Sequence, residues 1–203
     1  MQMLCFEEKM NIDILAKTIC KVAQDENDEL SELTQEGIYH MPELAFAYQC
    51  GKEIIRNSLD IFGTNEVKWS REEDLRNGGP TDLTLHINND FRVAIEFKMR
   101  DTASAYESDI KKLSKLKDNK TIKIFCALVD VLEKDMDDDG RQRHIENLSG
   151  YEVLPIHKMK FKTKQNWYKS QVYCVACVWS VGNIPEMQIL QGAQVRRLSR
   201  CLY

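Results

Sequence analysis

The sequence lacks any apolar run that approaches the roughly 20 residues needed to span a membrane as a helix. Its first residues lack the basic and then apolar layout of a secretory signal. The seven cysteines are odd in number and irregular in spacing, which is typical of reduced thiols rather than of a disulfide framework. We therefore expect a cytoplasmic protein without a membrane partner.

Internal repeats and low-complexity segments are also absent. Hydrophobic residues make up 43% of the 203 positions and charged residues 30%, a balance typical of a globular protein rather than a disordered one. We expect a single domain over residues 1–203 with its core at about 38–131. Residues 1–37 would form a helical extension, and residues 151–203 a basic, β-rich part.

Charge is distributed unevenly along the chain. Residues 1–150 contain 20 Lys and Arg against 30 Asp and Glu, whereas residues 151–203 contain eight Lys and Arg and only the acids Glu152 and Glu186. An acidic body with a basic C-terminal part suits a protein that holds cations in one place and an anionic polymer in another. The alternative is an asymmetry that arose by chance.

Apolar periodicity and turn signals divide the chain into helices and strands. A capping box of Ser104 and Glu107 is expected to start the third helix. The order of elements within residues 42–131 predicts an α/β or α+β fold. Helices are expected at about 6–33, 42–60, 103–117 and 143–149, strands at 67–70, 81–87, 92–99 and 121–131, and four further β segments after residue 150, of which the last is Glu186–Leu190.

Residues 81–99 are expected to form a hairpin that places two acids opposite each other. If residues 88–90 make a three-residue turn, the numbers of paired residues add up to 178. One face of the hairpin is then entirely apolar and should enter the core. On the other face Asp82 lies opposite Glu96, and Lys98 follows Glu96 on the same side.

Two carboxylates placed opposite each other on a sheet repel. A shared proton, the Lys98 ammonium or a divalent cation would each relieve the repulsion. Carboxylate oxygens suit Mg²⁺, and a bound Mg²⁺ can polarise a phosphate and activate a water molecule. The alternative is an exposed sheet face with an ordinary surface pattern of Glu and Lys.

The segment Pro80-Thr81-Asp82, followed by Glu96-Phe97-Lys98, resembles the signature of the PD-(D/E)XK nuclease superfamily. Thr81 departs from the literal motif, in which the acid directly follows the proline. The resemblance covers residues 38–131 and implies a restriction-endonuclease-like αβββαβ core with a mixed central sheet flanked by helices. It also implies phosphodiester hydrolysis that depends on Mg²⁺, for which Mn²⁺ can substitute.

The resemblance assigns roles to individual residues. Asp82, Glu96 and Lys98 would be catalytic, and Asp82, Glu96, the Phe97 carbonyl and Glu43 would bind the metal. Glu43 has an alternative role, because an acid in the first turn of a helix also stabilises the helix dipole. Lys112 and Tyr106 on the helix after Lys98 are candidates for a position near the phosphate, although Tyr106 also fits a core position.

A row of lysines on one face of a C-terminal strand is a candidate for binding nucleic acid: Lys158, Lys160, Lys162 and Lys164, with Trp167 beyond them. Such a row can follow phosphates, and the aromatic ring can stack on a base. The alternative is an edge strand that its lysines protect from aggregation. Arg196, Arg197 and Arg200 would extend the basic surface.

Two further motifs are weaker. Residues 135–146 match the spacing of an EF-hand Ca²⁺ loop, but Arg141 and Arg143 would crowd the cation and a strand precedes the segment, so a solvated acidic loop is the favoured reading. Cys174 and Cys177 are spaced as half of a zinc site. On a strand, however, their sulfurs would lie on opposite faces, so two buried thiols are favoured.

Together these features predict a metal-dependent nuclease, and a restriction-like DNA endonuclease would cut duplex DNA as a homodimer. The alternative is a non-catalytic module on the same fold that binds nucleic acid or a protein. The intact set of Asp82, Glu96 and Lys98 favours the enzyme.

Overall fold

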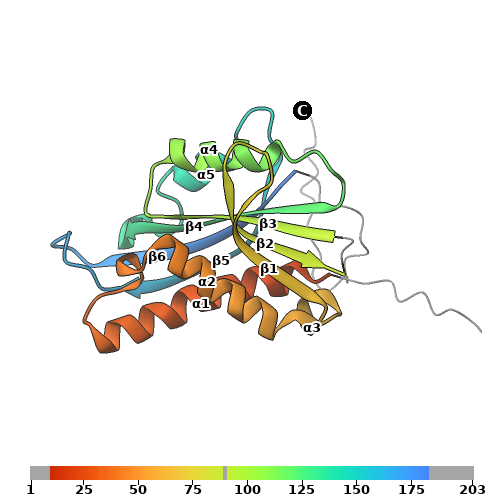
Figure 1. Ribbon diagram of the computed structural model, residues 1–203. Coiled ribbons are helices and arrows are strands. Elements are labelled where there is room, and N and C mark those ends of the chain that lie inside the picture. Colours follow the sequence, from red (N-terminus) through yellow and green to blue (C-terminus); the bar gives the residue numbers. More distant parts are fainter. Residues whose placement is uncertain (1–9, 89–90, 183–203) are drawn as a thin grey trace, which may run out of the picture.

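The computed structural model describes residues 10–88 and 91–182. A mixed sheet of six strands in the order β1-β2-β3-β4-β6-β5 runs through the middle of the molecule (Figure 1). Strands β3 and β4 are parallel, and the other neighbours are antiparallel. The strands are β1 (Val67–Asp74), β2 (Pro80–Ile87), β3 (Phe91–Met99), β4 (Thr121–Leu132), β5 (Val153–Thr163) and β6 (Val172–Val181).

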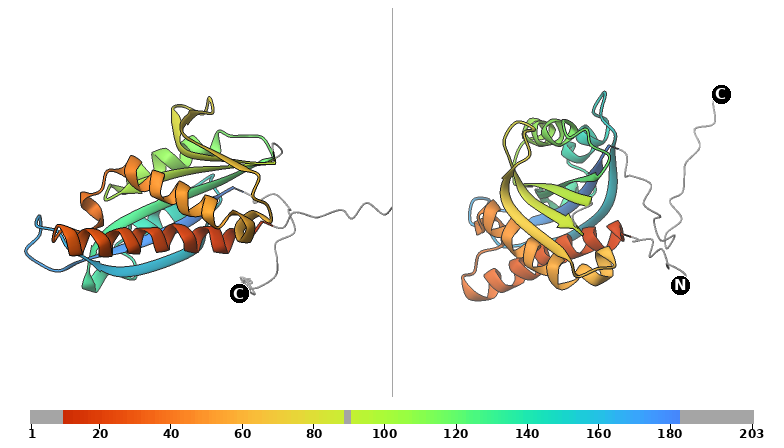
Figure 2. Two further views of the ribbon diagram at one scale, coloured as in Figure 1. Left: turned by 60° about the horizontal axis from the view of Figure 1, so that its bottom comes forward. Right: turned by 45° about the vertical axis from the view of Figure 1, so that its right-hand side comes forward.

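Helices cover both faces of the sheet, so the molecule has three layers (Figures 1 and 2). Helices α1 and α2 lie side by side against one face, and α4 and α5 lie against the other. The helices are α1 (Ile12–Leu33), α2 (Glu43–Arg56), α3 (Ser58–Phe62), α4 (Ala103–Ser114) and α5 (Arg141–Glu146), with the short 3₁₀ turns η1 (Ile38–His40) and η2 (Glu133–Asp135).

The β2–β3 hairpin has the expected register. Leu83 pairs with Ile95 and Ile87 with Phe91, so the partner numbers add up to 178. The apolar face of the hairpin packs in the core beneath α1 and α2, as predicted. On the other face Thr84, Ala94 and Glu96 are buried, with α4 packed over Ala94, whereas His86 and Arg92 near the turn are only partly buried. The alternative of an ordinary exposed surface is therefore wrong for the end of the hairpin that carries Glu96.

The connection between β3 and β4 determines what lies over the hairpin. Two neighbouring parallel strands need a crossover connection, and α4 provides it. Its N-cap is Thr102, whose hydroxyl accepts a hydrogen bond from the Ala105 N–H at 3.3 Å. The predicted capping box of Ser104 and Glu107 is wrong, because Glu107 instead pairs with Lys111 on the helix surface.

The expected elements are present, with altered boundaries. Helix α1 begins at Ile12, after the N-cap Asn11. The predicted helix at 42–60 is two helices, α2 and α3, with Gly63 in the left-handed conformation after the second. β1 is longer than predicted, and the first two C-terminal segments form one strand, β5, with an irregularity between Pro155 and His157. The predicted strand at Glu186–Leu190 and the arginines at 196, 197 and 200 lie outside the described residues.

Within residues 10–88 and 91–182, no helix is long and apolar enough to cross a membrane.

Candidate active site

Four elements bring acidic and basic side chains together at one end of the sheet. Strand β2 supplies Asp82, β3 supplies Glu96 and Lys98, and the first turn of α2 supplies Glu43. Each of these was expected at the site from the sequence. Helix α4 adds Asp109 and Lys112. We call the whole group the acid cluster: Glu43, Asp82, Glu96 and Asp109, with the counter-ions Lys98 and Lys112.

Asp82 and Glu96 influence each other, as expected for facing acids. The pairing of β2 with β3 ends at Leu83 and Ile95, one residue before it would reach the two acids. There Asp82 Oδ2 instead accepts a hydrogen bond from the Phe97 N–H at 2.8 Å. Burial raises the pKa of Asp82, while the hydrogen bond from Phe97 lowers it.

Glu96 is the most buried acid of the cluster, with 2% exposure. One carboxylate oxygen, Oε2, accepts a hydrogen bond from Lys112 Nζ at 2.8 Å. The other, Oε1, is buried without a hydrogen-bond partner among the described residues. Burial and the neighbouring Asp82 carboxylate raise the pKa of Glu96 to about 8, against the opposing effect of Lys112. A cation close to this carboxyl group would stabilise its ionised form and lower its pKa.

Lys98 lies between two carboxylates. Its Nζ is 3.2 Å from Asp109 Oδ2 and 3.6 Å from Glu43 Oε1. Burial lowers the pKa of Lys98, but the two acids outweigh this and the net shift is upward. Lys98 therefore carries a positive charge at neutral pH and can stabilise negative charge on a substrate.

Glu43 joins the helix layer to the end of β3. Its Oε2 accepts a hydrogen bond from the Met99 N–H at 3.0 Å, so the carboxylate is held where β3 ends. Burial raises its pKa, and Lys98 lowers it. The ring of Phe97 is fully buried in the core and meets Phe46 edge to face at 5.3 Å. A metal-binding role for the Phe97 carbonyl stays a prediction.

Asp109 is a member of the cluster that the sequence prediction missed. It lies on α4, three residues after Tyr106 and three before Lys112, and residues at this spacing share one face of a helix. That spacing was the available signal, since Lys112 and Tyr106 had already been placed near the site. Tyr106 is a core residue with 0% exposure.

The fit of this cluster to a divalent cation is supported by its donor atoms and by the unpartnered Glu96 Oε1. The described part of the chain contains no group of three or more His, Cys, Asp or Glu side chains arranged around a common metal position. The acids are instead held by Lys98, Lys112 and backbone N–H groups. A cation would therefore replace part of these interactions.

The lysine row on β5 is divided between two neighbours. Lys158 donates to Gln142 Oε1 on α5, and Lys160 pairs with Asp137, which lies in the segment before α5. Lys164 lies beyond the end of β5 and donates to Ser31 O at 3.2 Å. Lys162 is exposed. Of the four lysines, Lys160 is paired with an acid, and Lys158 and Lys164 donate to neutral oxygens. Binding of nucleic acid by this row stays a prediction.

The sequence grouped Trp167 with the lysine row, but its ring lies against the segments next to the acid cluster. Its ring stacks on His40 at a centroid distance of 4.6 Å, and the Arg100 guanidinium lies over it at 4.0 Å. His40 comes three residues before Glu43, and Arg100 directly follows Met99. Trp167 therefore contacts the two segments that hold Glu43 in place.

The segment at 135–146 is an acidic loop only as far as Gly140, because residues 141–146 form helix α5 with Gln142 and Ile145 buried. Asp137 pairs with Lys160, Asp139 with Arg141, and Glu146 accepts a hydrogen bond from Trp179 Nε1 at 2.9 Å. These acids face separate partners rather than a common point. Cys174 and Cys177 are both buried and belong to core clusters on opposite faces of the sheet, which agrees with the reading as two inert thiols. Burial raises the pKa of both thiols.

Comparison with known proteins gives no independent indication of function. No protein-family model, curated protein or solved structure matches this chain. The interpretation of the acid cluster therefore depends on its chemistry and on its place in the sheet.

Proposed function

We propose that the protein is a metal-dependent nuclease of the restriction-endonuclease-like type that hydrolyses phosphodiester bonds in DNA. The single observation that carries the proposal is the pair of the half-buried Asp82 and the buried Glu96 at the end of a β-hairpin, with Lys98 two residues after Glu96 on the same strand. The helix, three strands, helix and strand from α2 to β4 follow the αβββαβ order that the sequence resemblance implies.

Each residue of the acid cluster has a role in this proposal. Asp82, Glu96 and Glu43 would hold Mg²⁺ or Mn²⁺, together with the Phe97 carbonyl. The cation supplies Lewis acidity and lowers the pKa of a bound water. Lys98 keeps its proton, because Asp109 and Glu43 raise its pKa, and so it would donate from Nζ to the phosphate or to the attacking water. Asp109 positions the Lys98 ammonium.

Lys112 makes a contact that the sequence did not predict. Its ammonium is hydrogen-bonded to Glu96 Oε2, so it serves as the internal counter-ion of the pair. In the proposed enzyme, Lys112 would leave Glu96 when a cation binds and become available to a phosphate oxygen. This agrees with its predicted position near the nucleic acid.

Cleavage of plasmid and linear DNA in Mg²⁺, Mn²⁺ or EDTA tests the proposal. We expect cleavage in either metal and none in EDTA. Lys98→Ala and Asp82→Asn should each lower the cleavage rate by about 100-fold or more, because each removes charge stabilisation that the reaction requires. Lys68→Ala, an exposed lysine on β1, is the matched control and should cleave normally. Unchanged cleavage by Lys98→Ala would contradict the assignment.

The second candidate is a binding module without turnover. The ion pairs of Lys98 and Lys112 with the acids favour it, because they satisfy much of the cluster without any metal. The same assay separates the two: DNA binding without cleavage, unaffected by Lys98→Ala, supports the module.

A duplex-cutting enzyme should be a homodimer, which light scattering would measure.

A further inference from the structure

An open hollow of about 530 Å³ lies beyond the end of β3, the strand that carries Glu96 and Lys98. Residue 100 continues the parallel pairing past the end of β3, since the Arg100 N–H donates to Leu128 O at 2.9 Å. The N–H of the preceding residue, Met99, donates a hydrogen bond to Glu43 Oε2. The hollow therefore opens at the carboxyl ends of the two parallel strands. Its walls include Arg100, Asp101, Asp130, Arg141, Trp167 and Tyr168.

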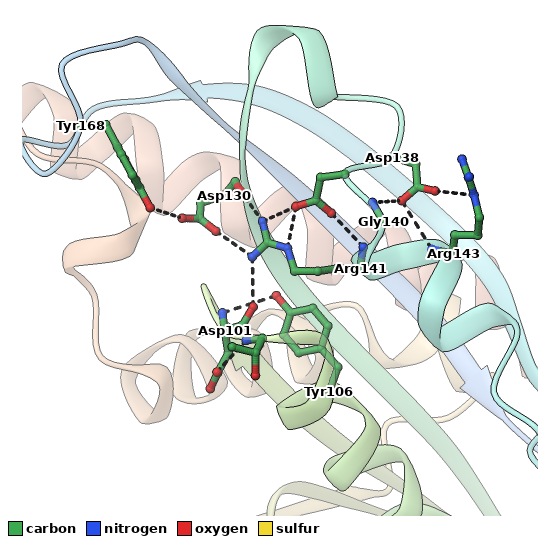
Figure 3. Close-up of polar contacts among 10 residues, drawn as sticks. Asp101, Tyr106, Asp130, Asp138, Gly140, Arg141, Arg143 and Tyr168 are labelled. Carbon is green, nitrogen blue, oxygen red and sulfur yellow. Dashed lines mark hydrogen bonds and ion pairs between the residues drawn. The ribbon is translucent and has the colours of Figure 1, made fainter.

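Arg141 forms a fixed floor for this hollow (Figure 3). Its Nη1 donates to Asp101 O at 3.0 Å and to Asp130 Oδ1 at 2.9 Å, and its Nε donates to Asp139 Oδ2 at 2.6 Å. The side chain is 19% exposed. Two carboxylates thus neutralise this guanidinium, so the floor is rigid and polar but is not itself a site for an anion.

The hollow is lined by two exposed aromatic rings and by charges of both signs, with Arg100 and Arg141 against Asp101 and Asp130. Trp167 is 47% exposed and Tyr168 is 51% exposed, which is unusual for large aromatic rings beside a polar hollow. Tyr168 points toward Asp130, and its hydroxyl lies 3.4 Å from Asp130 Oδ2 (Figure 3). Arg100 is exposed and lies over the Trp167 ring. Within the described ranges it has no ion pair with an acid, so its charge is available to a ligand.

An aromatic surface next to an available guanidinium suits a nucleotide, which has a flat base and an anionic phosphate. The volume also falls in the range of small-ligand sites. A base inside a duplex is already stacked on both sides, whereas an unpaired base can stack on an aromatic ring or a guanidinium plane. His40 and Arg100 already contact Trp167. Tyr168 is therefore the surface offered to a base, and the Arg100 guanidinium is left for a phosphate.

We propose that this hollow takes one unpaired nucleotide of the substrate, next to the phosphate that the acid cluster would cleave. The inference rests on the proposed nuclease function and sharpens it, because single-stranded or branched DNA becomes the preferred substrate over a fully paired duplex. Arg100 binds the phosphate of that nucleotide, and Tyr168 stacks on its base.

Fluorescence anisotropy in EDTA tests the hollow without any cleavage. The full chain is titrated into one labelled DNA oligonucleotide, into its duplex and into single-stranded RNA of the same sequence. We expect the single strand to bind about ten-fold more tightly than the duplex. Tyr168→Ala should weaken single-strand binding by about five-fold or more, because it removes a stacking surface. Tyr168→Phe keeps the ring and should bind as the unmodified protein does.

Tyr48→Ala is the matched control. Tyr48 is 44% exposed and has Lys52 and Arg71 near its ring, but it lies on α2 and not in the hollow. An equal loss in Tyr48→Ala and Tyr168→Ala, or tighter binding of the duplex, would overturn the inference. Binding through Tyr168 without cleavage in Mg²⁺ would refute the nuclease and keep the hollow. If duplex DNA is cleaved and Tyr168→Ala has no effect on binding or cleavage, the nuclease stands and the role of the hollow is refuted. Tighter binding of RNA than of DNA through Tyr168 would overturn the assignment to DNA.

Discussion

Glu96 is the residue whose surroundings differ most from those of an ordinary carboxylate. It is 2% exposed, lies beside Asp82, and has one oxygen without a hydrogen-bond partner in the described part of the chain. Lys112 offsets only part of the cost of ionising it. Burial raises the pKa values of all four acids in the cluster, and that of Glu96 rises to about 8.

The raised pKa of Glu96 predicts how stability depends on pH. The folded protein binds the Glu96 proton up to a pKa of about 8, whereas an unfolded chain releases it near the ordinary value of 4.5. Between these values the folded state holds more protons, so the free energy of unfolding falls as pH rises. The slope should reach about 1.4 kcal/mol per pH unit. Urea unfolding at a series of pH values in EDTA measures it.

Glu96→Gln is the control for this dependence. Glutamine has nearly the same shape but no charge, so the variant should lose most of the slope and be the more stable protein at pH 8. A slope in Glu96→Gln as steep as that of the unmodified chain would assign the effect to other acids. Asp82→Asn should also flatten the slope, because it removes a carboxylate whose charge helps to raise the pKa of Glu96.

At the scale of elements, α4 and the chain before α2 determine what reaches the site. The crossover between β3 and β4 carries Asp109 and Lys112 over the hairpin. On the opposite side, η1 and the first turn of α2 bring His40 and Glu43 to the end of β3. Both depend on close packing of connecting segments, which alternation of apolar residues does not encode.

Gly37 provides a test of this packing. It precedes η1, and a Cβ at this position would lie 2.1 Å from Thr163 Oγ1 and 2.6 Å from the Lys164 carbonyl oxygen. Its φ of −112° is accessible to any residue, so only the contact with the end of β5 requires glycine. We expect Gly37→Ala to lower the free energy of unfolding by about 1–3 kcal/mol through overpacking.

Urea denaturation measures this change, and Glu32→Ala on the exposed side of α1 is its control. That substitution should alter stability by no more than about 0.5 kcal/mol. If the two variants were equally stable, the close approach of the α1–η1 connection to β5 would not be required for folding.

At the scale of the whole molecule, charge links stability to metal binding. The acid cluster holds four carboxylates against two ammonium groups, and the complete chain has a net charge of −4. A cation that binds only the folded state stabilises it by mass action. Because Glu96 must lose its proton to bind a metal, this stabilisation should increase with pH.

Thermal unfolding with and without Mg²⁺ measures this linkage. At a concentration about 100 times its dissociation constant, Mg²⁺ should add about 2.7 kcal/mol to the stability, with a larger effect at pH 8 than at pH 6. Asp82→Asn should remove the effect, and Asp135→Asn should keep it. The opposite result would move the cation to the loop at 135–146 and away from the acid cluster.

The sequence alone determined the order of the main elements, the register of the hairpin and the closeness of Asp82, Glu96, Lys98 and Glu43. The register and the closeness of Asp82, Glu96 and Lys98 follow from local rules: side chains alternate on a strand, and turn residues set the pairing. The place of Glu43 was expected from the resemblance to the nuclease superfamily. Only the tertiary structure decided that α4 buries Glu96, that Asp109 holds Lys98, and that Trp167 and Tyr168 wall a hollow beyond the end of β3. These contacts join segments far apart in the chain, and their geometry depends on how whole elements pack.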